Sequence, residues 1–391
     1  MGSIEIPANT KYSILKSLQK KSKVSRAELA KNLKLSKPTI TDHVGQLIEK
    51  GIVQELGEGE SSKTGGRKPI LLEINENHRL IVSVDLSFKN PICAIANLKC
   101  ELLHETTVLV HSTASKEERC EAIGKAIDSL LEQIPCTYEK IGSIVISSPG
   151  VVGKDEELYF ANPQHSQWTN IGIKTYLASK YQGFVSVRND VNLALAAEME
   201  MGYGKEYNNL IYISCGLGLG SGIAFNRTIY EGESFAAGEI GAFMDQDSIQ
   251  SGMSLEDEIN MNTILKKIED DLHNGQKSRV KELLNEGEAI QFYHVIAAYE
   301  QEDPYIKRIF YEVGLKLGIA VANIVSLLDL GIVIFGGLYV VFSEDLLRGV
   351  KEITDKAKLI NPVLKASSLK SKSSIYGSFV VGMEHIIQLY S

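Results

Sequence analysis

The sequence is poor in the residues that hold small secreted or metal-bound domains together. Its five cysteines (Cys93, Cys100, Cys120, Cys136 and Cys215) are an odd number, and no two of them form a Cys-x-x-Cys pair. Disulfide frameworks and zinc ribbons depend on such paired cysteines. We therefore expect reduced thiols and a cytoplasmic protein.

A long hydrophobic run is also missing. The longest apolar-rich stretch, 331–342, is interrupted by Gly336 and Gly337, whereas a membrane-spanning helix needs about 20 apolar residues. The start of the sequence has no charged segment followed by an apolar core. We expect neither a secretory signal nor a membrane partner.

Positive charge is scarce in the chain as a whole but abundant at its start. The 391 residues have a formal net charge of −8. Residues 1–72 carry 13 Lys/Arg and 7 Asp/Glu, a net +6, and the remainder carries 28 and 42, a net −14. A basic head on an acidic body indicates a separate nucleic-acid-binding module. We expect three domains, at 1–75, 76–190 and 191–391.

The basic head has the pattern of a helix-turn-helix. Three short helices are predicted within 9–50. Ser25 and Glu28 form a capping box at the start of the second helix, and Ser36 can cap the third, which Gly51 ends. Two short helices joined by a tight turn are the helix-turn-helix unit.

Two alternating segments after these helices predict a wing. Residues 52–56 and 70–74 read as strands on either side of a Gly/Ser-rich tip. A major-groove reader places base contacts at the start of its last helix, and a basic wing tip can enter the minor groove. The candidate DNA-binding residues are Lys37, Thr39, Thr41, His43, Arg67 and Lys68. A small helical protein-interaction domain, and a plain solvated turn at the tip, remain alternatives.

The acidic body reads as a duplicated α/β unit. The first copy has three strands, a helix and a strand, and the second repeats this order with longer helices. The predicted strands are 80–86, 92–98, 102–110, 141–147, 184–188, 210–214, 223–225, 227–230 and 331–335, and the helices are 116–134, 191–201, 255–284 and 291–328. Two lobes built alike predict a cleft between them, where small ligands bind.

Several segments could line that cleft. Asn189 and Asp190 follow a strand and open a helix, where the helix dipole stabilises a carboxylate. Residues 216–222 have glycine at every second position, which lets backbone amides approach a phosphate. Glu239 is a single carboxylate among small residues. Asp190 could equally be a helix cap, and the glycines could form a tight hairpin.

Taken together, these segments resemble the ROK family of sugar-responsive repressors and sugar kinases. The motifs that carry the resemblance are 65–69, 189–192, 216–222, 237–241 and Gly336-Gly337. The resemblance implies an α/β fold class: an N-terminal winged helix-turn-helix followed by a two-lobed actin/hexokinase-like (ribonuclease H-like) ATPase fold. A C-terminal helix at about 374–391 would pack back on the first lobe. The winged helix points to the repressor branch, similar to xylose and N-acetylglucosamine repressors.

The resemblance also exposes departures from the kinases of the family. Their first phosphate loop is glycine-rich, but here Asp85 is followed by Leu-Ser-Phe-Lys, with bulky Phe88 in place of a bare amide. Leu217 replaces a threonine of the second phosphate loop. Asp190 stands where the kinases keep their catalytic base, and without a phosphoryl donor it would only hold a hydroxyl. We expect no enzyme activity, no catalytic residue and no cofactor.

The zinc site of the family is degenerate as well. The family binds zinc through a histidine and three cysteines, but Ala242 stands at the histidine position and 245–254 contains no cysteine, so this stretch supplies none of these nitrogen or sulfur ligands. We expect no metal. By resemblance, the sugar ligands are Asn162, Asn189, Asp190, Glu239 and Glu256. Asn162 has a turn residue as its alternative interpretation.

The sequence as a whole predicts a sugar-responsive transcriptional repressor of carbohydrate metabolism genes, such as those for xylose. Its partners would be operator DNA and a small sugar, and it would act as a homodimer or dimer of dimers. One alternative is an ATP-dependent sugar kinase carrying a DNA-binding head. Another is an activator or constitutive repressor with a vestigial ligand cleft.

Overall fold

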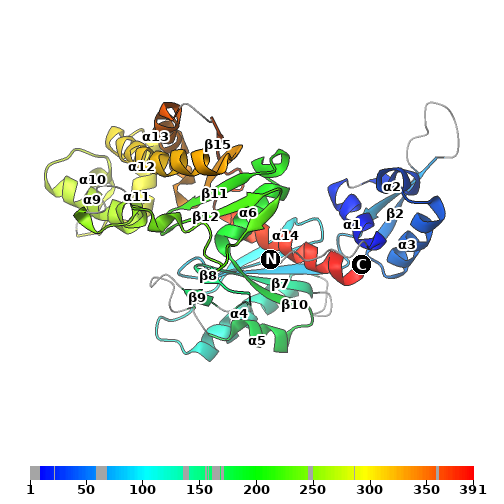
Figure 1. The fold of residues 1–391 in the computed structure, drawn as a ribbon. Coiled ribbons are helices and arrows are strands. Elements are labelled where there is room, and N and C mark those ends of the chain that lie inside the picture. Colours follow the sequence, from blue (N-terminus) through cyan, green and yellow to red (C-terminus); the bar gives the residue numbers. More distant parts are fainter. Residues whose placement is uncertain are drawn as a thin grey trace. The chain divides into compact units, whose positions relative to one another are not determined.

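The computed structural model divides the chain into two compact units (Figure 1). One unit comprises Met1–Asp190 with Ser378–Ser391, and the other comprises Val191–Gly377. The structure describes residues 9–21, 23–58, 68–134, 141–154, 156, 158–160, 168, 171–244, 250–285, 287–357 and 361–391.

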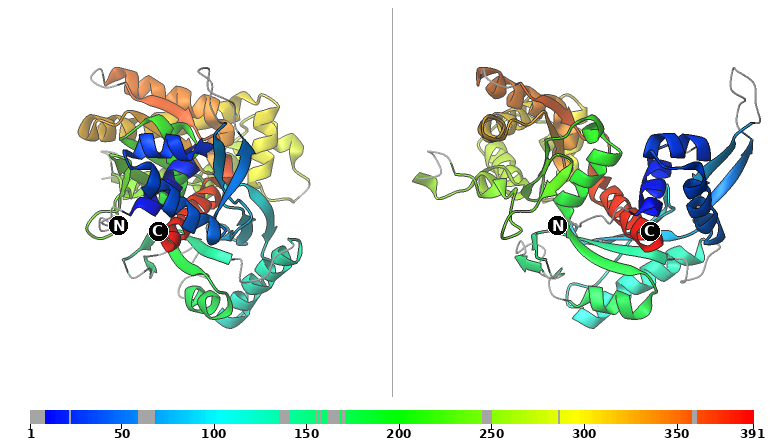
Figure 2. Two further views of the ribbon diagram at one scale, coloured as in Figure 1. Left: turned by 90° about the vertical axis from the view of Figure 1, so that its right-hand side faces the viewer. Right: turned by 45° about the vertical axis from the view of Figure 1, so that its right-hand side comes forward.

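The head at the start of the first unit is a winged helix-turn-helix (Figure 2). A three-stranded sheet of order β1-β3-β2 packs beside three helices. The elements are α1 (Thr10–Lys20), β1 (Val24–Ser25), α2 (Arg26–Leu33), α3 (Lys37–Glu49), β2 (Val53–Glu58) and β3 (Ile70–Ile74). The predicted helices and both wing strands are confirmed, whereas β1 was not predicted.

Local capping explains where the head helices begin. Ser25 and Glu28 form the predicted capping box of α2, and the Ser36 hydroxyl accepts the Thr39 backbone N–H at the start of α3. Lys34 ends α2 in the left-handed region, with φ 55°. These caps satisfy the exposed amides of the first turns, so they fix the turn that sets α3 against α2.

The rest of the first unit is built on a five-stranded sheet of order β10-β7-β4-β5-β6. Strands β10, β7 and β4 run parallel, and β4, β5 and β6 are antiparallel. Two helices contribute to the apolar core on one face of this sheet (Figure 1). The elements are β4 (Leu80–Asp85), β5 (Ile92–Ala96), β6 (Leu102–Thr107), α4 (Lys116–Glu132), β7 (Ile141–Ser148), α5 (Ile173–Lys180) and β10 (Phe184–Asn189), with the short pair β8 (Val151–Val152) and β9 (Leu158–Phe160).

The last helix, α14 (Ser373–Tyr390), packs on the other face of that sheet. A Cβ on Gly382 would lie 2.4 Å from the Ile81 side chain, so glycine permits this close approach. The Ser143 hydroxyl lies 3.1 Å from Nδ1 of His385. Burial lowers the pKa of His385 to about 4, and the ring is therefore neutral at physiological pH.

The second unit repeats the same sheet order. Its strands lie in the order β13-β12-β11-β14-β15, which from the opposite edge matches the first sheet strand by strand. Its elements are α6 (Asp190–Glu200), η3 (Tyr203–Glu206), β11 (Leu210–Cys215), β12 (Leu219–Phe225), β13 (Thr228–Tyr230), η4 (Ile240–Ala242), α8 (Leu255–Ile259), α9 (Met261–His273), α10 (Val280–Leu283), α11 (Phe292–Glu300), α12 (Pro304–Leu328), β14 (Ile332–Gly336), η5 (Leu338–Phe342), α13 (Ser343–Lys356), β15 (Val363–Ala366) and η6 (Lys370–Lys372). The predicted duplication is confirmed.

Two long helices predicted in the second unit are wrong in their extent. The segment 255–284 forms α8, α9 and α10, because Asn260 is extended (ψ 158°) and caps α9. The segment 291–328 is divided before Pro304, whose missing N–H suits the first turn of α12. Strand β12 begins earlier than predicted, and α5, α13 and β15 were not predicted.

Helix α12 is the one helix in the described ranges that is long and apolar enough to cross a membrane by length and composition. It is a longer apolar element than the 331–342 stretch singled out in the sequence. Its apolar face, which includes Phe310, Val313 and Leu317, is buried in the main core of the second unit. Such a face is what a core helix requires.

Candidate functional site

The start of α3 presents some of its predicted DNA contacts to solvent, but not all. Lys37 and Thr41 are exposed. Thr39 is half-buried, its backbone N–H donates to the Ser36 hydroxyl, and the two hydroxyl oxygens lie 2.7 Å apart. Thr39 therefore supports the cap of the helix, whereas Lys37 and Thr41 are available to a ligand.

His43 lies one turn further along α3 and is half-buried. Its Nδ1 is buried and has no hydrogen-bond partner among the described residues. At the wing, Lys68 is exposed just ahead of β3, and Arg67 lies outside the described residues. The structure thus describes five of the six predicted DNA-binding residues and leaves Arg67 as a prediction from the sequence.

The first unit carries Asn189 and Asp190 at the end of β10. Asn189 pairs with Ser148 on the neighbouring parallel strand β7. Its side-chain amide donates to the Gly150 carbonyl at 2.9 Å, and lies 3.4 Å from Oδ1 of Asp190. Both side chains are half-buried. The amide of Asn189 is therefore oriented by the β7 loop, beside a carboxylate at the start of α6.

The predicted phosphate-loop position follows β4 in the same unit. Asp85 is fully buried, and its Oδ1 accepts the Ser87 backbone N–H at 2.9 Å. The Leu86 backbone N–H donates to the Ser147 carbonyl, so the turn is tied to β7. Phe88 is half-buried in this turn. The Asp85 carboxylate thus stabilises the local turn.

In the second unit, two carboxylates lie close together. Glu256 in α8 accepts the Leu219 backbone N–H at 2.8 Å, and a Cβ on Gly241 would lie 2.9 Å from the same carboxylate oxygen. Loss of hydration, with the charge of Glu256 adding to it, raises the pKa of Glu239, although its side chain is exposed by area. These carboxylates can accept hydrogen bonds from hydroxyl groups.

The loop that carries Glu239 is fixed to β12 at Gly238. Its carbonyl accepts both the Ser221 backbone N–H (2.9 Å) and the Ser221 hydroxyl (2.8 Å). Gly238 has φ +94°, and a Cβ there would lie 2.0 Å from the Ser221 carbonyl oxygen. Only glycine meets both requirements. The position of Glu239 therefore depends on a residue without a side chain.

The glycine run 216–222 is partly a strand. Cys215 pairs with Leu219, so β12 begins within the run and the turn is confined to 216–218. The Gly216 N–H donates to the Gly218 carbonyl at 3.0 Å. A Cβ on Gly216 would lie 2.9 Å from the Leu338 side chain. The tight-hairpin interpretation explains these glycines without a phosphate.

The described residues at the positions that the resemblance assigns to zinc include no histidine or cysteine. Ala242 is exposed, and Ser254 caps α8 by accepting the Asp257 backbone N–H. Across the described ranges, no group of three or more His, Cys, Asp or Glu side chains is placed to hold a metal ion. The segment 245–249 and Asn162 lie outside the described residues.

Contacts between the head and α14 were not found from the sequence. Glu384 accepts the Tyr12 hydroxyl at 2.6 Å and pairs with Lys16 at 2.9 Å. Near the end of the helix, the buried Tyr390 hydroxyl lies 2.8 Å from Nε2 of His78. Glu384 is the one carboxylate in the apolar α14 sequence. A single charged residue in an apolar helix is the sequence signal that could have predicted a polar contact at this position.

Comparisons with known proteins match both parts of the chain. The ROK family profile matches residues 81–384, and a profile for winged helix-turn-helix DNA-binding domains matches residues 8–54. The xylose repressor of Caldicellulosiruptor bescii is 27% identical over 94% of this chain and 93% of its own. The xylose repressor of Staphylococcus xylosus is 31% identical over 72% and 71%.

A solved structure shares the fold over nearly the full length. It is a ROK family transcriptional regulator, described as a homologue of the E. coli MLC protein, and superimposes with a TM-score of 0.79. The match covers 97% of both chains at 19% sequence identity. The fold is therefore a winged helix-turn-helix followed by the two-lobed actin/hexokinase-like fold.

Proposed function

The chain belongs to the ROK family, and on that basis we propose that it is a transcriptional repressor that responds to xylose. One observation carries the proposal: a winged helix-turn-helix precedes the ROK domain in one chain, and xylose repressors match both together. A protein with this role acts where the DNA is, in the cytoplasm.

The head supplies the DNA-binding surface. Lys37 and Thr41 at the start of α3 contact the major groove, and Lys68 with Arg67 contacts DNA from the wing. A homodimer, or a dimer of dimers, places two heads on a palindromic operator. The exposure of Lys37, Thr41 and Lys68 supports this assignment.

The body supplies the effector ligands. By the family resemblance, the residues proposed to hydrogen-bond sugar hydroxyls are Asn162, Asn189, Asp190, Glu239 and Glu256. The oriented amide of Asn189 and the neighbouring carboxylates of the second unit support this set. Xylose changes operator binding only if its affinity differs between the DNA-binding and released forms.

The residues at the two phosphate-loop positions do not favour phosphoryl transfer. Phe88 and Leu217 are bulky side chains at positions that the resemblance assigns to phosphate loops, and Leu217 packs against the core of the second unit. We assign Asp190 a binding role rather than that of a catalytic base. Turnover of ATP by the full-length protein with xylose or glucose would instead establish the sugar-kinase alternative.

A gel-shift titration tests the repressor proposal. The probe is a duplex that the full-length protein selects from a random-sequence pool, at one fixed salt concentration. Xylose is expected to weaken binding about tenfold or more, which corresponds to a coupling free energy of about 1.4 kcal/mol, whereas arabinose is not. Equal affinity with and without every sugar tested, together with no sugar binding by calorimetry, would favour the constitutive-regulator alternative.

A further inference from the structure

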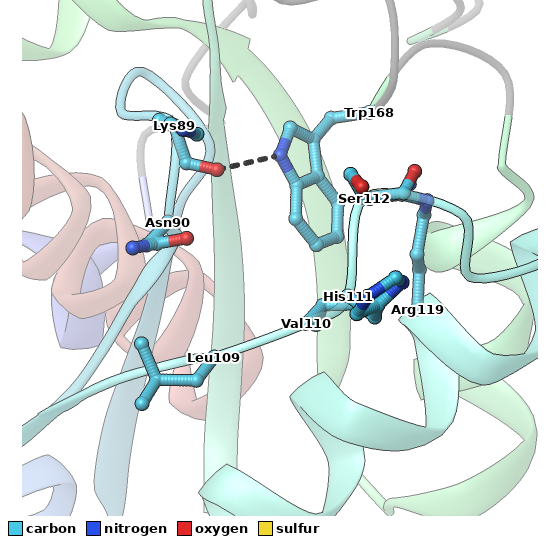
Figure 3. Close-up of a pocket in the computed structure, with 8 residues that line it drawn as sticks. All are labelled: Lys89, Asn90, Leu109, Val110, His111, Ser112, Arg119 and Trp168. Carbon is cyan, nitrogen blue, oxygen red and sulfur yellow. Dashed lines mark hydrogen bonds between the residues drawn. The ribbon is translucent and has the colours of Figure 1, made fainter.

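The first unit holds a cavity whose described lining residues include no proposed sugar ligand and no proposed DNA-binding residue. Its volume is about 460 Å³, within the range of small-molecule sites. It lies where the β4–β5 turn, the segment after β6 and the start of α4 meet. The lining residues that matter here are Lys89, Leu109, His111, Ser112, Arg119 and Trp168 (Figure 3).

Arg119 is a buried cation in the wall of this cavity. The residue is 6% exposed, and in the described part of the chain no carboxylate lies within ion-pair distance of it. Its Nε donates to the Ala114 carbonyl and its Nη2 to the Ser112 carbonyl. A guanidinium has five N–H donors and stays charged. The two carbonyls therefore orient this charge, and no carboxylate among the described residues neutralises it.

Trp168 fixes the other face of the guanidinium. The Arg119 guanidinium carbon lies 5.1 Å from the indole centroid, a cation–π distance. The indole N–H donates to the Lys89 carbonyl at 3.3 Å, which holds the ring in place (Figure 3). Figure 3 places Trp168 and Arg119 on one side of the drawn space and Leu109 on the other. Leu109 is 78% exposed, so this apolar side chain is available to a ligand.

The charge of the lining is of one kind. Lys89 and His111 add basic groups to Arg119, and the described residues that line the cavity include no carboxylate. An anion that enters such a site gains Coulomb energy from a cation already removed from water. The apolar side chains of Leu109 and Trp168 suit a ring rather than a bare ion.

We propose that this cavity binds a small organic anion, a phosphate or carboxylate joined to a ring. The anionic group pairs with the free donors of Arg119, with Lys89 adding positive charge, and the ring lies against Trp168 and Leu109. The described residues that carry this proposal are not among the proposed sugar ligands, so the proposal holds whether or not the protein responds to xylose.

The single tryptophan of the chain makes the proposal testable in the full-length protein, because all tryptophan fluorescence comes from this cavity. The probe is phenyl phosphate, with phenol as the neutral match and inorganic phosphate as the match without a ring. Phenyl phosphate is expected to change the fluorescence saturably, with an affinity at least tenfold above that of either match. Phenyl phosphate and phenol absorb ultraviolet light, which can itself change the measured fluorescence. Calorimetry with the same three probes measures binding without this interference.

Three variants locate the binding. Arg119→Gln is expected to weaken phenyl phosphate binding at least tenfold. Because that change also removes hydrogen bonds to the 112–114 carbonyls, Lys89→Met provides a second test that leaves them in place, with a several-fold loss expected. Lys125→Ala, on an exposed position of the same helix α4, is the control and leaves the affinity unchanged.

Specific results would overturn the proposal. One is the absence of saturable binding of phenyl phosphate at concentrations up to about 10 mM, where even a weak site of about 4 kcal/mol would fill. Another is equal binding of phenol and phenyl phosphate, which would leave no role for the cation. Unchanged affinity in both Lys89→Met and a folded Arg119→Gln would place the ligand elsewhere.

Discussion

At the scale of single residues, the carboxylate loop of the second unit depends on Gly238. Gly238→Ala forces a Cβ to within 2.0 Å of the Ser221 carbonyl oxygen, at a φ of +94° that favours glycine. We expect a loss of about 2 kcal/mol or more in unfolding free energy. Because Glu239 follows directly, xylose affinity should fall about tenfold or more. Denaturant melts and calorimetry measure the two effects.

The control for this substitution separates backbone strain from the clash. Gly252 also has positive φ (+71°), but a Cβ there meets nothing within 4 Å. Gly252→Ala should therefore cost only about 1 kcal/mol of strain and leave xylose affinity unchanged. If the two variants behaved alike, the contact between Gly238 and Ser221 would not be what positions the loop.

The raised pKa of Glu239 gives a second prediction at this scale. When the pKa of an acid is higher in the folded than in the unfolded protein, the folded state binds more protons between the two pKa values. The free energy of unfolding therefore falls as pH rises from the unfolded-state pKa to the folded-state pKa. Glu239→Gln should therefore raise the melting temperature slightly at about pH 7. The gain should vanish at about pH 3, below the ordinary glutamate pKa of about 4.3, where the carboxyl group is protonated in both the folded and the unfolded protein. The same change should weaken xylose binding, since it removes a charged acceptor.

Glu233→Gln is the matched control, because Glu233 is an exposed glutamate on the same segment. It should change neither the melting temperature nor the affinity for xylose. A lower melting temperature for Glu239→Gln at about pH 7 would show that the ionised carboxylate stabilises the loop, contrary to the direction expected from its pKa.

At the scale of elements, the sequence was most informative where side chains act on their own backbone. The Ser25 and Ser36 caps and the alternation of the wing strands predicted the head, because these signals span only a few residues. In the second unit, the predicted helices 255–284 and 291–328 run through the same kinds of signal at Asn260 and Pro304. Helix extent was therefore overestimated.

The candidate site shows a different limit of sequence reasoning. Its residue types were predictable from motifs, but their neighbourhood was not, because it is set by tertiary packing. Glu256 reaches the Leu219 amide 37 residues earlier in the chain only because α8 packs on η4 and η4 packs on β12. Nor did periodicity predict that Thr39 would be engaged by the cap of its own helix.

Contacts between helices α1 and α14 carry the next prediction. Glu384→Ala removes the Tyr12 hydroxyl contact and the Lys16 ion pair, whose side chains are about one-quarter exposed. The hydrogen bond and the partly screened ion pair together amount to about 1–2 kcal/mol. Hydrogen exchange of the α1 amides should therefore become faster, whereas exchange in α12 should not change.

Gln388→Ala provides the comparison on the same helix, because Gln388 is exposed on α14. Its α1 amides should keep the protection of the unaltered protein. If Glu384→Ala left α1 equally protected, the helix would be held by its apolar contacts alone, and Glu384 would not contribute to docking the head.

At the scale of the whole molecule, the net charge of −8 is the sum of two segments with opposite net charge. The +6 of residues 1–72 suits a phosphate backbone, and the −14 of the remainder suits a neutral sugar, which gains nothing from a basic surface. The salt dependence of DNA binding should therefore depend on the basic residues of the head alone, since each phosphate contact releases about one counterion.

Two lysine substitutions of equal charge test this separation. Lys37→Ala should weaken binding to the selected duplex and reduce the slope of log affinity against log salt by about 1, because Lys37 is exposed at the start of α3. Lys125→Ala removes the same charge from the exposed face of α4 in the body and should leave the slope unchanged. Gel shifts over a series of salt concentrations measure both slopes. Equal slopes for the two variants would mean that DNA binding depends on the net charge of the whole protein. The prediction that only the head determines the salt dependence would then be wrong.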